Sequence, residues 1–342
     1  MKLTKRAMMG ALVSAPAIVG LNRIARAVAA KTLKISHQFP GGTADAGDFR
    51  DRLCRKFAAA VEAKTQGEIA CEVHPASSLV KTVAQFSQMS QGKLDMSLYP
   101  LAYGGGEVKE LNIALMPCLV TSYEQGLAWR SAEIGRELNA TIEKAGVKIL
   151  TWVWQAGSVA SRAGAVVDPK DVKGLKIRGG SREFDLMLKA AGGVISSLPS
   201  NEIHNAMQTG RLDAAITSAT SLVSFEVEDV TKNLTTGRGK SFWFMLEPLL
   251  ISKTVFDALT PAQQAALVEV GESLVPFGLA SAKADDQAIA DIFLKEGARI
   301  HDMTSATVEN WRGIATETAW REYASRTPDC ARLLKLAQEV KA

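Results

Sequence analysis

A short pattern occurs twice in this chain, once in each half, and it restricts the folds that the chain can adopt. Residues 89–95 read Met-Ser-Gln-Gly-Lys-Leu-Asp, and residues 207–213 read Met-Gln-Thr-Gly-Arg-Leu-Asp. In both copies a helical pattern runs into a glycine, which suits the left-handed conformation at a helix C-terminus, and Leu-Asp then begins a strand. The pattern predicts two similar lobes facing each other across a groove. Coincidence is the alternative, because helix, glycine and strand often follow one another.

The rest of the chain alternates short strands with amphipathic helices, which is typical of mostly parallel sheets covered by helices on both faces. Residues 156–165 and 242–252 suit segments that cross between the lobes. A long helix is predicted from Thr260-Pro261, with a kink or break at Pro276. The candidate strands before the first crossing segment are 33–37, 69–73, 94–98 and 147–154.

The first 30 residues predict a cleaved secretory signal. Lys2, Lys5 and Arg6 form a basic start, and the apolar run that follows over residues 7–21 is too short and interrupted to span a membrane. Small residues suit cleavage near Ala29 or Ala30, which places the mature protein in the periplasm. An uncleaved anchor is the alternative.

Removal of this segment changes the charge of the protein. Five of the 40 basic residues lie in the first 30, which leaves 35 against 36 acidic residues and a net charge of −1. A nucleic-acid partner is therefore not expected. The four histidines and four cysteines are widely spaced, so no metal site is predicted. The cysteines could pair in an oxidising compartment, but the sequence does not say how.

Arg178 is the most informative single residue. Residues 175–178 alternate apolar and basic side chains as a short strand, and Gly179-Gly180 and a helical pattern from Ser181 follow. The order places a permanently charged guanidinium beside a helix N-terminus, where an anion is favoured. The alternative is that Arg178 pairs with a structural carboxylate or lies on the surface.

Recognition is predicted rather than catalysis. The chain has no G-x-S-x-G motif, no phosphate-binding loop and no G-x-G-x-x-G after a strand. Gly104-Gly-Gly106 is interpreted as a flexible turn, and Asp95 and Asp213 as structural groups at strand starts. A carboxylate pocket is predicted instead, built from Arg178 and nearby hydroxyl, aromatic and amide side chains: Ser158, Thr217, Ser218, Tyr99, Trp154, Trp243 and Gln38. For Tyr99, Trp154 and Trp243, burial in the core is an equally good interpretation.

Several segments together give a family resemblance. Residues 171–178 (Asp-Val-Lys-Gly-Leu-Lys-Ile-Arg) and 202–213 (Glu-Ile-His-Asn-Ala-Met-Gln-Thr-Gly-Arg-Leu-Asp) are specific in combination, and residues 57–67, 91–95, 115–119 and 259–264 support them. The chain resembles the extracytoplasmic solute-binding proteins of tripartite ATP-independent periplasmic (TRAP) transporters, the DctP family. The resemblance covers nearly the whole chain after residue 30.

The resemblance implies an α/β, two-lobed periplasmic-binding-protein-like fold, with two mixed or parallel sheets flanked by helices, crossing hinge strands and a long connecting helix. Lobe I is assigned residues 31–155 and 243–283, and lobe II residues 156–242 and 284–342. The resemblance also implies three partners: a small carboxylate ligand and the small and large membrane subunits of the transporter. No cofactor is expected.

The resemblance also implies roles for individual residues. Arg178 matches the family arginine that pairs with the ligand carboxylate, and Thr217 matches a position where an asparagine often touches the ligand. Ser158 matches a second arginine of sialic-acid binders, and this departure favours a monocarboxylate such as a 2-oxo or 2-hydroxy acid. A periplasmic sensor, or a secreted enzyme on the same fold, is the alternative.

Overall fold

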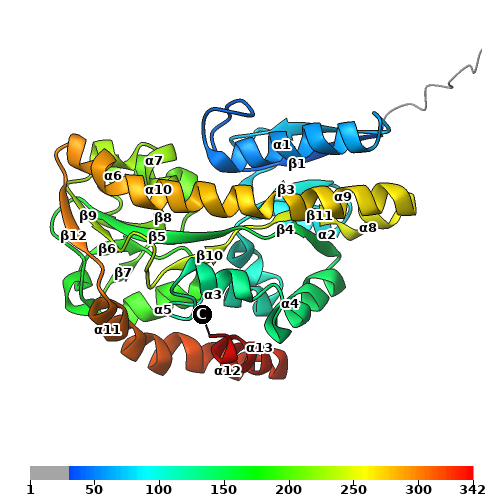
Figure 1. Ribbon diagram of the computed structural model, residues 1–342. Coiled ribbons are helices and arrows are strands. Elements are labelled where there is room, and N and C mark those ends of the chain that lie inside the picture. Colours follow the sequence, from blue (N-terminus) through cyan, green and yellow to red (C-terminus); the bar gives the residue numbers. More distant parts are fainter. Residues whose placement is uncertain (1–30, 342) are drawn as a thin grey trace, which may run out of the picture.

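Two β-sheets lie side by side in the computed structural model, which describes residues 31–341 (Figure 1). The predicted signal peptide, residues 1–30, lies outside the described residues. The first sheet has the strand order β2-β1-β3-β11-β4. Its strands are β1 (Lys31–Ser36), β2 (Ile69–His74), β3 (Met96–Leu98), β4 (Val147–Thr151) and β11 (Leu249–Ser252).

The second sheet has the order β12-β9-β5-β8-β6-β7, and β10 pairs with β5 outside this path. Both sheets are mixed: β1 runs parallel to β2 and β3, and β6 runs parallel to β7 and β8, while β11 and β5 run antiparallel to their neighbours. The strands are β5 (Trp154–Ser161), β6 (Lys176–Arg178), β7 (Val194–Ile195), β8 (Ala214–Ser218), β9 (Asn233–Thr236), β10 (Phe244–Leu246) and β12 (Arg299–Asp302).

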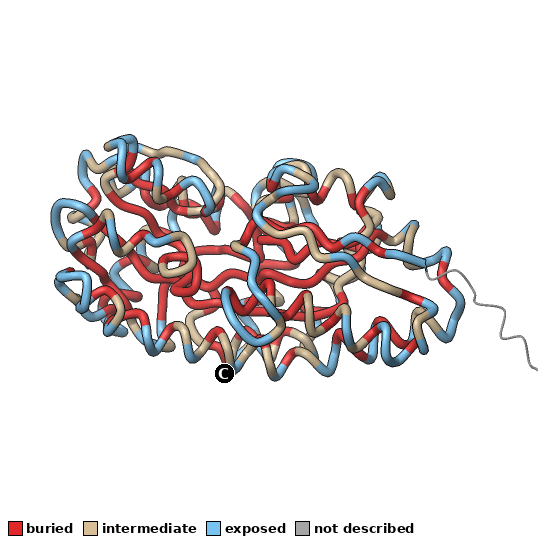
Figure 2. Tube along the Cα trace, turned by 90° about the horizontal axis from the view of Figure 1, so that it is seen from above, coloured by how far each residue is buried: buried red, intermediate tan, exposed pale blue. Residues whose placement is uncertain are grey.

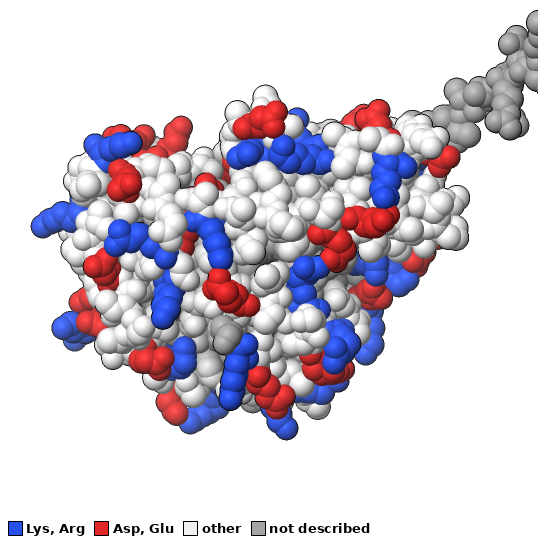
Figure 3. Space-filling model, in the orientation of Figure 1, with Lys and Arg blue, Asp and Glu red and all other residues white. Residues whose placement is uncertain are grey.

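Helices cover both sheets, so the predicted α/β fold with two flanked sheets is confirmed. They are α1 (Phe49–Lys64), α2 (Gln85–Ser90), α3 (Tyr123–Ala128), α4 (Glu133–Lys144), α5 (Arg182–Ala190), α6 (Ile203–Gln208), α7 (Ala219–Ser224), α8 (Lys253–Asp257), α9 (Pro261–Ser273), α10 (Val275–Lys295), α11 (Ser305–Ala315), α12 (Arg321–Arg326) and α13 (Pro328–Glu339). Basic and acidic side chains are interspersed on the face shown in Figure 3.

Two chain segments cross between the sheets. The first leads from β4 into β5, and the second returns from β10 into β11. They run antiparallel, and the Glu247 N–H donates a hydrogen bond of 2.8 Å to the Val153 carbonyl between them. The helix from Pro261 to Lys295 breaks at Leu274, beside Pro276 as predicted. By length and composition alone this helix could cross a membrane; here α9 packs on β4, and α10 packs on β5, α1 and α7.

The repeated Gly-x-Leu-Asp units have the same local geometry in the two sheets. Gly92 and Gly210 both adopt positive φ angles, 70° and 74°, at the ends of helices. The Asp95 carboxylate accepts a 2.8 Å hydrogen bond from the backbone N–H of Lys34, and Asp213 accepts the same bond from Lys176. Each aspartate thus joins its own strand to the neighbouring parallel strand, so the predicted structural role of both is confirmed.

The Gly104–Gly106 segment is not a flexible turn, so that prediction is wrong. It ends a 3-10 helix, η2 (Leu101–Gly106), in which Gly104 and Gly105 are buried. A Cβ atom on Gly105 would lie 2.1 Å from the Asn112 side chain, and one on Gly104 would lie 2.9 Å from Leu111. These glycines let a second 3-10 helix, η3 (Lys109–Leu115), pack directly on η2.

The C-terminal helices contact both sides of the molecule. The helix α11 and the π-helical turn Thr316–Trp320 pack against α5, whereas α13 packs against α4 and η3. Figure 2 shows buried backbone running through the centre of the molecule. The largest cluster of buried apolar side chains includes residues from both sheets. The predicted division at residues 155/156, 242/243 and 283/284 therefore stays a prediction.

The contact between α9 and β4 gives a test of this packing. A Cβ atom on Gly271 would lie 2.4 Å from the Leu150 carbonyl, and the Thr151 hydroxyl donates a hydrogen bond to the Gly271 carbonyl. We expect Gly271→Ala to lower the free energy of unfolding by about 1–3 kcal/mol, because the helix must move away from the sheet. Urea unfolding followed by circular dichroism measures this change.

Gly313→Ala is the matched control, because Gly313 lies in α11 and a Cβ atom added there would have no neighbouring atom within 4 Å among the described residues. We expect this variant to be about 0.5–1 kcal/mol more stable than the wild type, since alanine favours a helix over glycine. Equal changes in the free energy of unfolding for Gly271→Ala and Gly313→Ala would contradict the close contact between α9 and β4.

Candidate ligand-binding site

The ends of four strands bring most of the predicted site residues to the boundary between the sheets. In the first sheet Ser36 of β1 pairs with Ser97 of β3. Gln38 and Tyr99 each lie two residues further along the chain, just after the ends of these two parallel strands and at the same edge of the sheet. In the second sheet Arg178 ends β6, and Thr217 lies near the end of the adjacent β8. This is the edge of an open α/β sheet at which ligands ordinarily bind.

Arg178 is fully buried, and its guanidinium is held by neutral groups. The Nε–H donates to the Leu198 carbonyl at 3.0 Å, Nη1 donates to the Ile216 carbonyl at 2.8 Å, and Nη2 donates to the Tyr103 hydroxyl at 2.6 Å. Arg178 forms no ion pair with any residue between 31 and 341. No carboxylate in this range therefore bonds to Arg178, although burial raises the pKa values of Asp185 and Glu247 and the charge of Arg178 opposes this rise. Two of its five N–H groups remain without an acceptor there.

The turn after Arg178 is built to hold the guanidinium. Gly180 has a φ angle of +97°, and a Cβ atom on it would lie 2.7 Å from Arg178 Nη1, so a larger residue would displace the charge. The Trp243 indole N–H donates a 2.9 Å hydrogen bond to the Gly179 carbonyl. Ser181 then caps α5 by accepting a bond from Phe184. The predicted order of strand, glycine turn and helix is thus confirmed.

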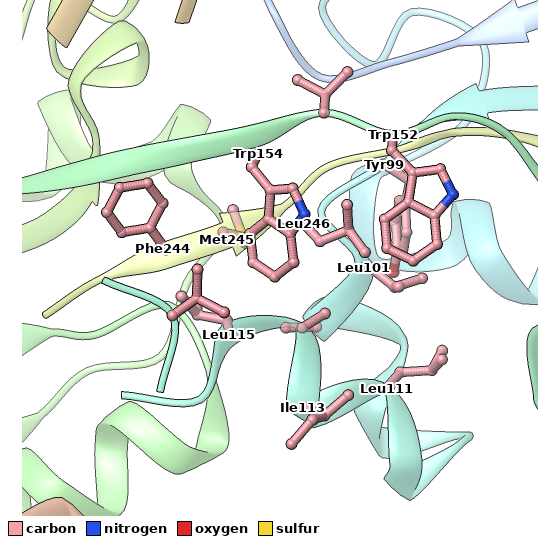
Figure 4. Packing of buried hydrophobic residues seen from close by; sticks show 14 of the residues in the cluster. Tyr99, Leu101, Leu111, Ile113, Leu115, Trp152, Trp154, Phe244, Met245 and Leu246 are labelled. Carbon is pink, nitrogen blue, oxygen red and sulfur yellow. The ribbon is translucent and has the colours of Figure 1, made fainter. Parts of the chain in front are cut away.

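Four of the predicted residues carry a buried polar group without a hydrogen-bond partner in the described part of the chain. Such groups normally bind water or a ligand, because burial without a partner costs about 1–3 kcal/mol each. The four residues are Gln38, Tyr99, Trp154 and Ser158. Figure 4 shows the Trp154 indole, together with that of Trp152, on one side of the first crossing segment, facing the part of the chain with Leu111 and Leu115.

The other predicted residues have different surroundings. Thr217 is buried directly opposite Ser158 in the β5–β8 pair. Trp243 uses its N–H on Gly179 and packs its ring on Gly157, so it supports the Arg178 turn. Ser218 is the N-cap of α7, where its hydroxyl accepts from the Ser221 N–H. A direct ligand contact for Trp243 or Ser218 stays a prediction.

A second buried arginine, Arg50, lies close to this boundary, and the sequence analysis did not find it. It begins α1 and forms a two-bond pair with Asp48, at 2.9 and 2.7 Å, and an ion pair of 3.2 Å with Glu247. Its Nη1 also donates to the Ser221 hydroxyl of the second sheet's α7 at 2.9 Å. Burial raises the pKa of Glu247, and Arg50 opposes this rise. Unlike Arg178, Arg50 is already neutralised.

Two cavities open at this boundary, and residues from both sides line each of them. One of about 360 Å³ is lined by Val83, Ala102 and Tyr103 on one side and by Gly180, Ser181 and Leu198 on the other. The other, of about 340 Å³, lies between residues 40–48 and the helices α7 and α10. Arg178 lines neither cavity, because its side chain is fully buried.

This geometry agrees with the comparison to known proteins. Residues 43–327 match the model of the family described as bacterial extracellular solute-binding protein, family 7. The chain belongs to this family, the DctP family. The predicted membership is confirmed, and the protein is a solute-binding receptor of the TRAP type rather than an enzyme. Family members are periplasmic binding proteins.

Individual relatives cover nearly the whole length of this DctP-family receptor. A solute-binding protein of Albidiferax ferrireducens is 54% identical over 308 residues, which are 90% of this chain and 91% of that protein. A crystal structure of a TRAP periplasmic solute-binding protein from Rhodoferax ferrireducens with bound malonate has a TM-score of 0.89 and 54% identity, covering 90% of this chain and 98% of that one.

A more distant structure shows only that the fold is shared. A Bordetella pertussis extracytoplasmic solute receptor binding pyroglutamic acid has a TM-score of 0.80 at 19% identity, over 91% of this chain and 100% of that one. In sequence, the C4-dicarboxylate-binding periplasmic protein DctP of Rhodobacter capsulatus is 23% identical over 318 residues, which are 92% of each chain.

The Arg50 cluster gives a test of how this boundary is stabilised. Arg50→Met would leave Asp48 and Glu247 buried without their cation, so we expect a loss of about 3–5 kcal/mol in the free energy of unfolding. Arg332→Met removes the two ion pairs of a half-exposed arginine, with Glu137 and Asp329, and should cost less than about 1 kcal/mol. Urea unfolding of both variants makes the comparison. Similar losses of unfolding free energy in the two variants would show that the buried Arg50 ion pairs stabilise the protein no more than exposed ones do.

Proposed function

We propose that this receptor captures a small organic acid in the periplasm, pairs its carboxylate with Arg178, and delivers it to the small and large membrane subunits of a TRAP transporter for secondary uptake. The observation that carries the proposal is the fully buried Arg178 guanidinium, which has no carboxylate partner in residues 31–341 and two unused N–H groups. A buried cation of this kind is stabilised when an anion binds beside it.

The charges around the site favour a ligand with one carboxylate at this anchor. Arg50 is the other fully buried arginine at the boundary, and Asp48 and Glu247 already balance its charge. The unpartnered groups of Ser158, Gln38 and Trp154 are neutral, and they suit a carbonyl or hydroxyl oxygen. These observations support a 2-oxo or 2-hydroxy monocarboxylate. The related receptor from Rhodoferax binds malonate, a dicarboxylate, which makes malonate the necessary comparison.

Closure follows from the placement of these groups on two sheets. Gln38 and Tyr99 come from the first sheet, and Arg178 and Ser158 come from the second. A carboxylic acid that contacts both sets binds the closed form more tightly than the open form, so it shifts the population toward closure. The crossing segments between β4 and β5 and between β10 and β11 are where the chain can bend.

Arg178→Lys tests the anchor. A lysine retains the charge but cannot reproduce the planar, two-bond geometry, so we expect the affinity for the bound acid to fall about 100-fold, equivalent to about 2.7 kcal/mol. Calorimetric titration measures the affinity, and circular dichroism checks the fold. Arg321→Lys, at an exposed arginine, should leave the affinity unchanged. An unchanged affinity of the Arg178→Lys variant for the acid would contradict the proposal that Arg178 pairs with the ligand carboxylate.

The ligand class is tested by a thermal-shift panel of pyruvate, lactate, pyroglutamate, malonate and the neutral sugar glucose. A ligand at 100 times its dissociation constant stabilises the native state by about 2.7 kcal/mol. We expect a monocarboxylate of the panel to raise the Tm more than malonate does, and glucose to have no effect. A larger shift with malonate would overturn the monocarboxylate assignment. A shift with glucose and with none of the acids would overturn the proposed function.

A further inference from the structure

Tyr103 connects the two sides of the molecule at the carboxylate anchor itself. It lies in η2, which follows β3 of the first sheet. Its hydroxyl oxygen accepts a 2.6 Å hydrogen bond from Arg178 Nη2 and a 3.2 Å bond from the Ser200 N–H, both on the side of the second sheet. The predicted site did not include this residue, and the family comparison does not assign it a role.

The hydroxyl proton of Tyr103, a half-buried residue that lines the cavity of about 360 Å³, is free to bond to a ligand. A phenol has one O–H proton to donate, and both of the bonds named above are bonds that its oxygen accepts. Over residues 31–341 no acceptor for that proton is found. The hydroxyl lies within hydrogen-bond distance of a guanidinium that itself has unused N–H groups. An anion seated on those groups is therefore placed to accept the phenolic proton as well.

We propose that Tyr103 is a second ligand-binding residue, which donates its phenolic proton to the carboxylate held by Arg178 and closes the site across the two sheets. This inference rests on the proposed function. It identifies a binding residue on the first-sheet side of the anchor, whereas Arg178 lies on the second.

The surroundings of Tyr103 hold its ring in place before the ligand arrives. The Tyr99 ring packs edge-on against it, with 6.2 Å between the ring centroids. The backbone that follows is fixed by the contact of Gly105 with Asn112, whose amide donates a bond to the Gly105 carbonyl. The tight packing of η2 on η3 fixes the hydroxyl relative to these two segments. An opening motion that separates η2 from β6 would break the bond to Arg178, so Tyr103 should act mainly on ligand release.

Tyr103→Phe tests the inference, because it removes the hydroxyl and keeps the ring that packs on Tyr99. The ligand is the tightest-binding acid among pyruvate, lactate, pyroglutamate and malonate. We expect the dissociation constant to rise about 10-fold, as for one hydrogen bond to a charged group, and mostly through a faster dissociation rate in stopped-flow measurements. A purely structural hydroxyl would lower the Tm of the ligand-free protein and leave the dissociation rate unchanged.

Tyr323→Phe is the matched control, since the Tyr323 hydroxyl is also hydrogen-bonded, to the Glu110 carbonyl at 2.9 Å, among the C-terminal helices. It should alter the Tm at most and leave ligand dissociation as in the wild type. If Tyr103→Phe binds and releases the acid as the wild type does, the inference is overturned and the proposed function stands. If the wild type binds glucose and none of the four acids, the proposed function fails and the inference fails with it.

Discussion

A guanidinium that is removed from water needs acceptors for its N–H groups and a compensating charge nearby. Arg178 has the acceptors, from two backbone carbonyls and the Tyr103 hydroxyl, but it forms no ion pair within residues 31–341. Burial raises the pKa values of Asp185 and Glu247 and the charge of Arg178 opposes this rise, yet these carboxylates bond to Ser197 and Arg50 instead. Much of the local structure serves this arrangement. The left-handed Gly180 leaves space for the guanidinium, and Trp243 fixes the turn through the Gly179 carbonyl. The protein thus keeps one positive charge buried and oriented, which is the basis of the proposed carboxylate anchor.

Arg50 is a second buried arginine at the same boundary, and it differs from Arg178 because it forms ion pairs. Its charge is balanced by Asp48 and Glu247, and its remaining bonds reach Ser218, at the end of β8, and Ser221 on α7. The boundary therefore holds one arginine that forms ion pairs and one that forms none, within the described part of the chain. On the proposed function, selectivity for an acid would follow from this difference more directly than from the shape of the surrounding apolar side chains.

The sequence predicted the elements whose signals are local. The strand ending at Arg178, the glycine turn and the two Gly-x-Leu-Asp units were found because neighbouring residues determine their geometry. Tyr103 and Arg50 were missed, since their partners lie far away in sequence: Arg178 and Ser200 for the first, Ser221 and Glu247 for the second. The glycines at 104–106 were misinterpreted for the same reason, because their close packing depends on Asn112 and Leu111. Periodicity also could not show that the Trp243 N–H turns toward Gly179.

The C-terminal helices connect parts of the molecule that the proposed closure would move relative to each other. The helix α11 rests on α5, beside the anchor turn, while α13 rests on α4 and η3 on the other side. Opening of that kind would have to bend or slide this arm, which would resist opening together with the crossing segments. The stiffness of the arm would then enter the energy difference between open and closed forms, on which the apparent affinity depends. Substitutions in residues 305–339 would therefore change the affinity for the ligand with every ligand contact left as it is.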